Sequence, residues 1–253
     1  MKTLSVAALL LILVFWTGPS NADTGINVHL GAQFGGAAVT FTGDGGTLPP
    51  FAVTDPDYLG AGFLGPVVTV EFKEFFALRS GILYTHTGAE WNWTAPVGGD
   101  TTTTANLFTR LVYFQIPLLA KFTLPNQSRF KPYLYAGSAW MYNTSSELQV
   151  EEEDWFANVK QRYYKVYYPE VYNAKKDQFM GIVGVGCDAV MGKVRVSLEG
   201  QYMMGLNTVF DDVPNMNAIT KDKVAVLKDL TGAGSDFKHR IFSVNIGVSY
   251  QLK

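Results

Sequence analysis

Residues 114–140 read FQIPLLAKFTLPNQSRFKPYLYAGSAW, and this stretch decides the class of fold that we expect. Alternate residues of its first part are apolar, and a β-strand places alternate side chains on opposite faces. The turn-forming residues PNQS at 125–128 separate this part from a second segment of similar length. Each segment is long enough to cross a bilayer as a tilted strand, which takes about 9–11 residues. The stretch therefore predicts a β-hairpin with an apolar face.

The same alternation recurs along the rest of the chain, and we expect eight strands in all. The last strand has the most regular stripe, with an apolar residue at every second position from Phe242 to Leu252. In the strand at 131–142 the assignment of the faces stays open, because the consecutive residues Tyr133, Leu134 and Tyr135 all fit an apolar face and cannot all lie on it. The predicted strands are 25–34, 64–72, 76–84 (or to 86), 114–122, 131–142, 179–189, 194–204 and 241–252.

The connections between these strands alternate in length. Three are short turns, and the four others are long and polar, at 42–56, 88–106, 145–177 and 207–238. Outer-membrane barrels have an even number of strands, with short turns at one end and long loops at the other. A compact soluble domain seldom carries four loops of this size. We therefore predict an all-β fold, an eight-stranded antiparallel up-and-down transmembrane β-barrel with four long extracellular loops and short periplasmic turns.

The first 22 residues have the pattern of a cleaved export signal. Lys2 is followed by an apolar run at 4–15, and small residues precede a cleavage site between Ala22 and Asp23. The apolar run is shorter than the roughly 20 residues of a membrane-spanning helix. We expect a signal peptide at 1–22, a single barrel domain at 23–253, and a location in the outer membrane of a Gram-negative cell.

The composition and the motifs of the chain argue against several classes of function. A formal net charge of −2 gives no basic footprint for nucleic acid. The one cysteine, Cys187, lies in an apolar strand pattern and fits a small buried or lipid-facing residue better than a reactive thiol. The acidic run 151–154 lacks the spacing and the glycine of a calcium loop. We therefore predict no cofactor, no metal site and no nucleic-acid partner.

The strand faces opposite the apolar stripes carry charges of both signs, which in a barrel point into the interior. An eight-stranded barrel is just wide enough to be filled by side chains. These residues therefore predict a salt-bridged plug, and glycines on the same faces are expected to make room for the long charged side chains. The predicted network consists of Glu71, Arg79, Gln115, Lys121, Asp188, Arg195 and Glu199. The glycines are Gly31, Gly81, Gly184, Gly186 and Gly247.

Several segments resemble the PorT-like, OmpA-like outer-membrane β-barrel family. Residues 114–122, FQIPLLAKF, followed by 131–137, KPYLYAG, resemble the family signature YLEIPLLLKY … KPYLLAG. Residues 78–84, LRSGILY, resemble its LRSGLLY strand, and the glycine-rich 181–186 resembles its sixth strand. The chain departs from the family pattern at Gln115, where a glutamate is usual, and in its long, acidic and tyrosine-rich third loop.

This resemblance covers most of 23–253 and implies an outer-membrane barrel domain of the cell envelope. Most members of the family have no assigned activity. The member that gives the family its name is linked to type IX protein secretion, and a shared fold alone does not transfer that role. The missing carboxylate at Gln115 removes one interior ion pair that the family pattern implies.

The loops are the parts of such a barrel that can meet another protein. We predict a monomer with a structural, adhesive or assembly role, which contacts outer-membrane lipid and binds an extracellular or envelope protein through 145–177 and 207–238. The tyrosine-rich stretch 162–172 is expected to extend two strands of the barrel above the membrane.

Two other functions are alternatives to this one. A lipid A-modifying enzyme could use His86 beside Thr85 and Glu90 as a base, but no second element offers a matching serine nucleophile. We therefore predict no enzymatic activity and no catalytic residue. A soluble eight-stranded ligand carrier would need a tryptophan near its first strand, and none lies there.

Overall fold

The computed structural model describes residues 26–42, 59–72, 75–98, 101–125, 128–156, 159–169, 175–209 and 238–252. The predicted signal peptide at 1–22 and most of the predicted loops at 42–56 and 207–238 lie outside these ranges. In the part that is described, no helix is long and apolar enough to cross a membrane. The strands are β1 (Ile26–Thr42), β2 (Leu59–Phe72), β3 (Phe76–Gly81), β4 (Leu83–Gly98), β5 (Thr101–Thr123), β6 (Phe130–Phe156), β7 (Val159–Pro169), β8 (Asp177–Met191), β9 (Val194–Gly205) and β10 (Lys238–Gln251).

The strands close into an antiparallel ring of eight, which confirms the predicted up-and-down barrel. β10 pairs with β1 to complete the ring, from Gln251 opposite His29 to Lys238 opposite Thr42. β3 and β4 together fill one place in the ring, because both pair with β2 on one side and with β5 on the other. They are interrupted only at Ile82, whose backbone N–H donates to Pro66 O at 3.0 Å.

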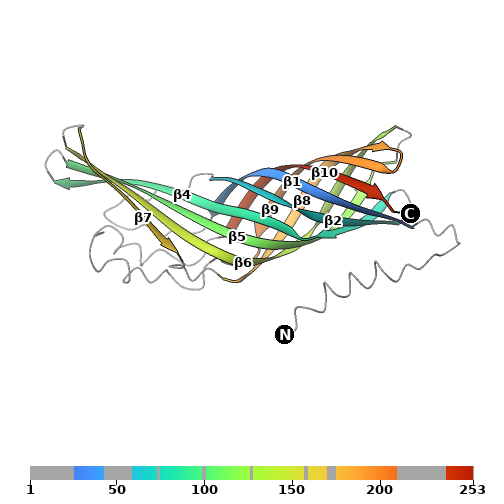
Figure 1. Ribbon diagram of the computed structural model, residues 1–253, viewed down its shortest axis with the longest axis horizontal. Coiled ribbons are helices and arrows are strands. Elements are labelled where there is room, and N and C mark those ends of the chain that lie inside the picture. The colour runs from blue at the N-terminus through green and yellow to red at the C-terminus, as the bar shows by residue number, and fades with distance from the viewer. Residues whose placement is uncertain are drawn as a thin grey trace.

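Two hairpins run out beyond the ring at one end, as Figure 1 shows on the left. β4 pairs with β5 as far as Gly98 opposite Thr101, and β6 pairs with β7 from Phe156 opposite Val159. We call this the hairpin end. The opposite end, which carries the short β2–β3, β5–β6 and β8–β9 connections, is the turn end.

These hairpins correct the prediction of long loops at 88–106 and 145–177, because most of both stretches is strand. The threonines at 101–104 and the valines and tyrosines of β7 favour extended backbone although they make the stretches look polar. The strand extension expected at 162–172 is present up to Pro169, and the remainder lies outside the described residues.

Alternation separates an apolar outer surface from a filled interior. On β10 and at the residue that follows it, the six apolar residues at alternate positions from Phe242 to Leu252 are all exposed on the outer surface. Ser243 and Asn245 between them, and Ile241 just before them, are buried. The open face assignment on β6 is also resolved. Tyr133 and Tyr135 are each 2 % exposed and lie inside, whereas Leu134 is 54 % exposed and lies outside.

Candidate functional site: the barrel interior

Glu199 of β9 is the centre of an ion network in the turn-end half of the interior. Its carboxylate accepts hydrogen bonds from both terminal nitrogens of Arg79, including Nη2 to Oε2 at 2.9 Å. Gln33 Nε2 donates to it at 2.9 Å and Tyr133 Oη at 2.5 Å. Glu199 is 1 % exposed, so it is removed from water and its charge is matched by that of Arg79.

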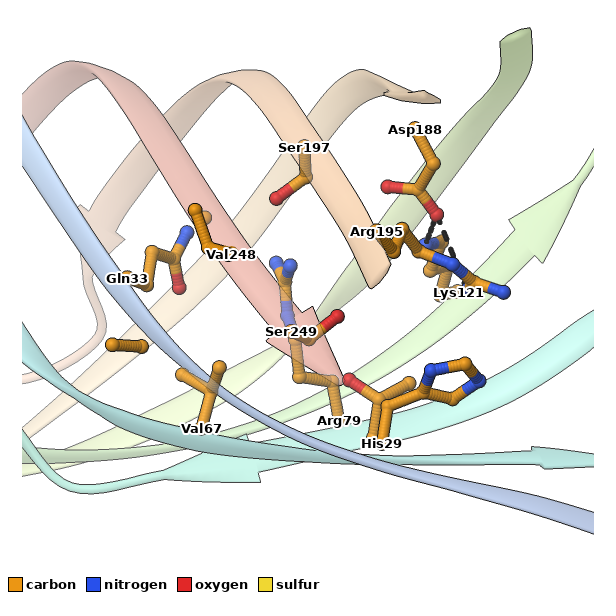
Figure 2. A pocket seen from close by; sticks show the side chains of 13 residues that line it. His29, Gln33, Val67, Arg79, Lys121, Asp188, Arg195, Ser197, Val248 and Ser249 are labelled. Carbon is orange, nitrogen blue, oxygen red and sulfur yellow. Dashed lines mark hydrogen bonds and ion pairs between the residues drawn. The ribbon is translucent and has the colours of Figure 1, made fainter. Parts of the chain in front are cut away.

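A second set of charges lies beside it, closer to the turn end. Arg195 is shared between two carboxylates, because it forms a bidentate ion pair with Glu71 and its Nη1 also lies 3.3 Å from Asp188 Oδ2. The Nε2 atom of His29 lies 3.1 Å from Glu71 Oε2. Lys121 Nζ donates to Asp188 Oδ2 at 2.5 Å. Figure 2 shows Lys121 and Arg195 converging on Asp188.

Tyr133 connects the two sets of charges, and Tyr135 packs against the first set. The ammonium of Lys121 lies 3.7 Å from the ring centroid of Tyr133, whose hydroxyl donates to Glu199. The guanidinium of Arg79 lies 5.0 Å from the centroid of Tyr135. Three acids, three bases and two aromatic rings therefore form one continuous network across the interior.

Glycines opposite these tyrosines make the arrangement possible. The register places Tyr133 opposite Gly186 and Tyr135 opposite Gly184. A Cβ atom at Gly186 would lie 2.5 Å from Tyr133 Cζ, and one at Gly184 would overlap the ring of Tyr135. The interior glycines at these two positions thus accommodate tyrosine rings and not, as expected from the sequence, long charged side chains.

The structure brings together six of the seven predicted network residues and separates the seventh. Gln115 lies nearer the hairpin end, where its Oε1 accepts from Thr85 Oγ1 at 3.2 Å and its Nε2 faces Met203 Sδ at 3.7 Å. Sequence reasoning missed His29, Gln33 and both tyrosines as members of the network. For His29 and Gln33 the signal was available, because both alternate with the apolar stripe of β1.

Unsatisfied polar atoms surround a small cavity within the network. Asp188 Oδ1, Arg195 Nε and His29 Nδ1 are buried and have no hydrogen-bond partner. All three residues line a cavity of about 20 Å³, together with Gln33, Arg79 and others (Figure 2). That space suits one or two water molecules, which could satisfy donors and acceptors alike.

The hairpin-end half of the interior is different, because most of its large buried side chains are apolar and none of its buried described residues forms an ion pair. Polar side chains are buried beside them, such as those of Thr109, Gln178 and Ser243. His239 lies among the apolar side chains, with its ring 4.9 Å from that of Phe41 and its Nε2 3.2 Å from Tyr113 Oη. The alternation of apolar and polar residues did not reveal this layer. Its buried hydrophobic members are Val39, Phe41, Phe63, Leu83, Leu111, Tyr113, Met141, Met180, Met203 and Ile241.

The side chains of His86 and Thr85, which were considered for catalysis, do not converge. His86 is exposed on the outer surface with its ring against Tyr84, at 4.8 Å between centroids. Thr85 faces the interior, so the two side chains lie on opposite sides of the barrel wall. Among the described residues, no group of three His, Cys, Asp or Glu side chains is placed to hold a metal ion.

The closed ring, the apolar outer surface and the filled interior define a β-barrel of the outer-membrane type. A family model described as "outer membrane protein beta-barrel domain" matches residues 20–211, and the chain belongs to this family. The protein is thus an outer-membrane β-barrel. A search of curated proteins gives no match.

Solved structures with a similar course of the chain are also outer-membrane proteins. Neisserial surface protein A is 12 % identical over 88 % of this chain and 96 % of its own, with a TM-score of 0.37. OprG from Pseudomonas aeruginosa is 11 % identical over 90 % and 95 %, with a TM-score of 0.33. The protease OmpT from Escherichia coli is 13 % identical over 90 % and 96 %, with a TM-score of 0.32. Likenesses this distant carry no argument about activity.

Proposed function

We propose that the protein is a monomeric outer-membrane barrel with a closed interior, which serves the cell envelope through its projecting hairpins and conducts no solute. The observation that carries this proposal is the filling of the interior by two stacked layers. Glu199 and its partners occupy the turn-end layer, and residues such as Leu111 and Met203 occupy the hairpin-end layer. A water-filled path would have to cross both.

The proposed orientation of the barrel in the membrane follows from the different lengths of the connections at its two ends. Short turns of outer-membrane barrels face the periplasm, and the longer connections face outward. The turn end is therefore assigned to the periplasm and the hairpin end to the cell exterior, after removal of a signal peptide near Ala22. Within the family, the signature at 114–122 and 131–137 supports a place among PorT-like members.

The β6–β7 hairpin is the proposed contact for an extracellular or envelope protein, together with the predicted loop at 207–238. The register places Glu151 opposite Lys165 and Asp154 opposite Arg162. Opposite charges at facing positions favour this pairing, so the acidic run is better explained as part of a hairpin than as an ion site.

Conductance measurements test the closed interior. The full-length mature protein is purified from outer membranes and inserted into a planar lipid bilayer. We expect no stepwise conductance from folded protein, with folding checked by its shift on a gel when the sample is boiled. A steady conductance of single inserted barrels, abolished by heat, contradicts the proposal.

Site-specific crosslinking tests the proposed contact. A photoreactive residue placed at Tyr163 or Tyr167 of β7 is expected to capture an envelope protein in intact cells. The matched control places the same residue at Val244, on the lipid-facing surface of β10, where no such adduct is expected. Equal labelling at the β7 and β10 positions contradicts a contact through the hairpin.

A further inference from the structure

Arg240 lies on the outer surface of β10, directly above its apolar stripe. Its neighbours in sequence, His239 and Ile241, are buried inside, so Arg240 belongs to the same outward face as Phe242. From Phe242 to Leu252 the stripe covers about 33 Å of strand, or about 25 Å along the membrane normal at a tilt of about 40°. This is the height of the apolar band of an outer-membrane barrel, and it places Arg240 at the headgroup level of one leaflet.

The guanidinium of Arg240 is held in place by two neighbouring strands. Its Nε donates to Thr42 Oγ1 of β1 at 3.0 Å, and its Nη1 donates to Tyr202 Oη of β9 at 3.1 Å. These bonds use two of the five N–H donors of an arginine and leave three for another acceptor. The side chain is thus fixed on the outer surface, and no other side chain or backbone group of the described residues accepts from its three remaining donors.

A second cation lies on the same face. Lys238 is two residues from Arg240 on β10, which corresponds to about 7 Å along a strand. Within the described ranges, no carboxylate forms an ion pair with either residue. The interior cations Arg79, Lys121 and Arg195, by contrast, each have an acidic partner.

We propose that Arg240 and Lys238 bind the phosphate of a lipid in the outer leaflet. A phosphate oxygen accepts charge-assisted hydrogen bonds from a guanidinium fork, and the second cation neutralises the remaining charge. The acyl chains of the same lipid lie along the stripe that begins at Phe242. The assignment to the outer leaflet rests on the proposed orientation of the barrel.

Lipid binding to the full-length mature protein in detergent tests this site. The probes are bisphosphorylated lipid A and the same lipid without phosphate, and native mass spectrometry counts the bound molecules. We expect the phosphorylated lipid to bind more tightly, and Arg240→Gln with Lys238→Gln to lower its affinity by about tenfold. Arg240→Lys keeps the charge but not the fork, so a smaller loss is expected.

Two controls make the result specific. Lys193→Gln removes an exposed cation from the β8–β9 turn at the other end of the barrel and is expected to leave binding unchanged. Inorganic phosphate at the same concentration is not expected to displace the lipid, and displacement would assign the site to free phosphate instead. Equal affinity for the two lipids, or an equal loss in Lys193→Gln, overturns the proposal. The gel shift on boiling reports the folded barrel separately, so failure of the lipid site and failure of the barrel assignment are distinguishable.

Discussion

The two halves of the interior are built from the same strands but are held by different forces. Along the inward face of β9, the residues change from Arg195 at the turn end through Glu199 to Met203 toward the hairpin end. Along β5 they change from Lys121 to Leu111. The turn-end half depends on directional bonds between charges, and the hairpin-end half depends mainly on the packing of large apolar side chains among smaller polar ones.

The difference teaches how each half can fail. A buried charge that loses its partner keeps the cost of leaving water, so one deletion weakens the whole network. An apolar side chain that is shortened leaves a cavity, whose cost depends on how far the neighbours can collapse. The turn-end half is therefore expected to be sensitive to the identity of its residues, and the hairpin-end half to their volume.

Glu199→Ala is expected to have the largest effect. It leaves Arg79 buried without a counter-charge, which costs about 3–5 kcal/mol in the free energy of unfolding. The measurement is urea unfolding of the barrel in phospholipid vesicles, followed by tryptophan fluorescence. Arg79→Met combined with Glu199→Leu should recover a large part of the loss, because no unpaired charge remains. A double variant that is as unstable as the sum of the single variants contradicts this account of the network.

Leu111→Ala tests the apolar half of the comparison. Leu111 is fully buried, and its truncation should cost about 2–5 kcal/mol of unfolding free energy by leaving a cavity. Leu118 lies on the same strand but is 52 % exposed on the outer surface, where lipid can fill the space left by its truncation. Leu118→Ala is therefore the matched control with a smaller loss. Equal losses in the same urea titration would show that the interior layer is not tightly packed.

Gly186→Ala tests whether the packing of Tyr133 against Gly186 contributes to stability. The added methyl group overlaps the ring of Tyr133 and displaces it from Lys121 and Glu199, at a cost of about 1–3 kcal/mol in unfolding free energy. Gly200 has no atom within 4 Å of the corresponding position, so Gly200→Ala should be close to neutral. If both variants unfold at the same urea concentration, the contact between Gly186 and Tyr133 is not important for stability.

His86→Ala should have the smallest effect. The side chain lies on the outer surface and contacts Tyr84, and its loss changes neither half of the interior. We expect the mass spectrum of lipid A from cells that carry the variant to match that of cells with the unchanged protein. A modified lipid A species that disappears with His86 would support the alternative of a lipid-modifying enzyme.

Much of the barrel could be predicted from the sequence, because alternation is a local property of each strand. The stripe from Phe242 to Leu252 and the face of Phe114 required only the period of two residues. The alternation of short and long connections along the chain then predicted an antiparallel up-and-down ring. The hairpin at 88–106 was not predicted, and of the hairpin at 145–177 only the strand extension at 162–172 was predicted, since their pairing depends on a partner strand and their polar composition resembles that of a loop.

The sequence by itself determined which residues face inward on every strand of the ring except β6, and that six of them carry balanced charge. Only the tertiary structure decided which acid meets which base, because the register and closure of the ring bring Arg79 and Glu199 together across 120 positions of sequence. It also excluded Gln115 from the ion network and placed Tyr133 against Gly186. The physical reason is that alternation within one strand decides whether a side chain faces the interior or the outer surface. A contact across the interior depends instead on the stagger between strands, which cannot be read from the sequence of any single strand.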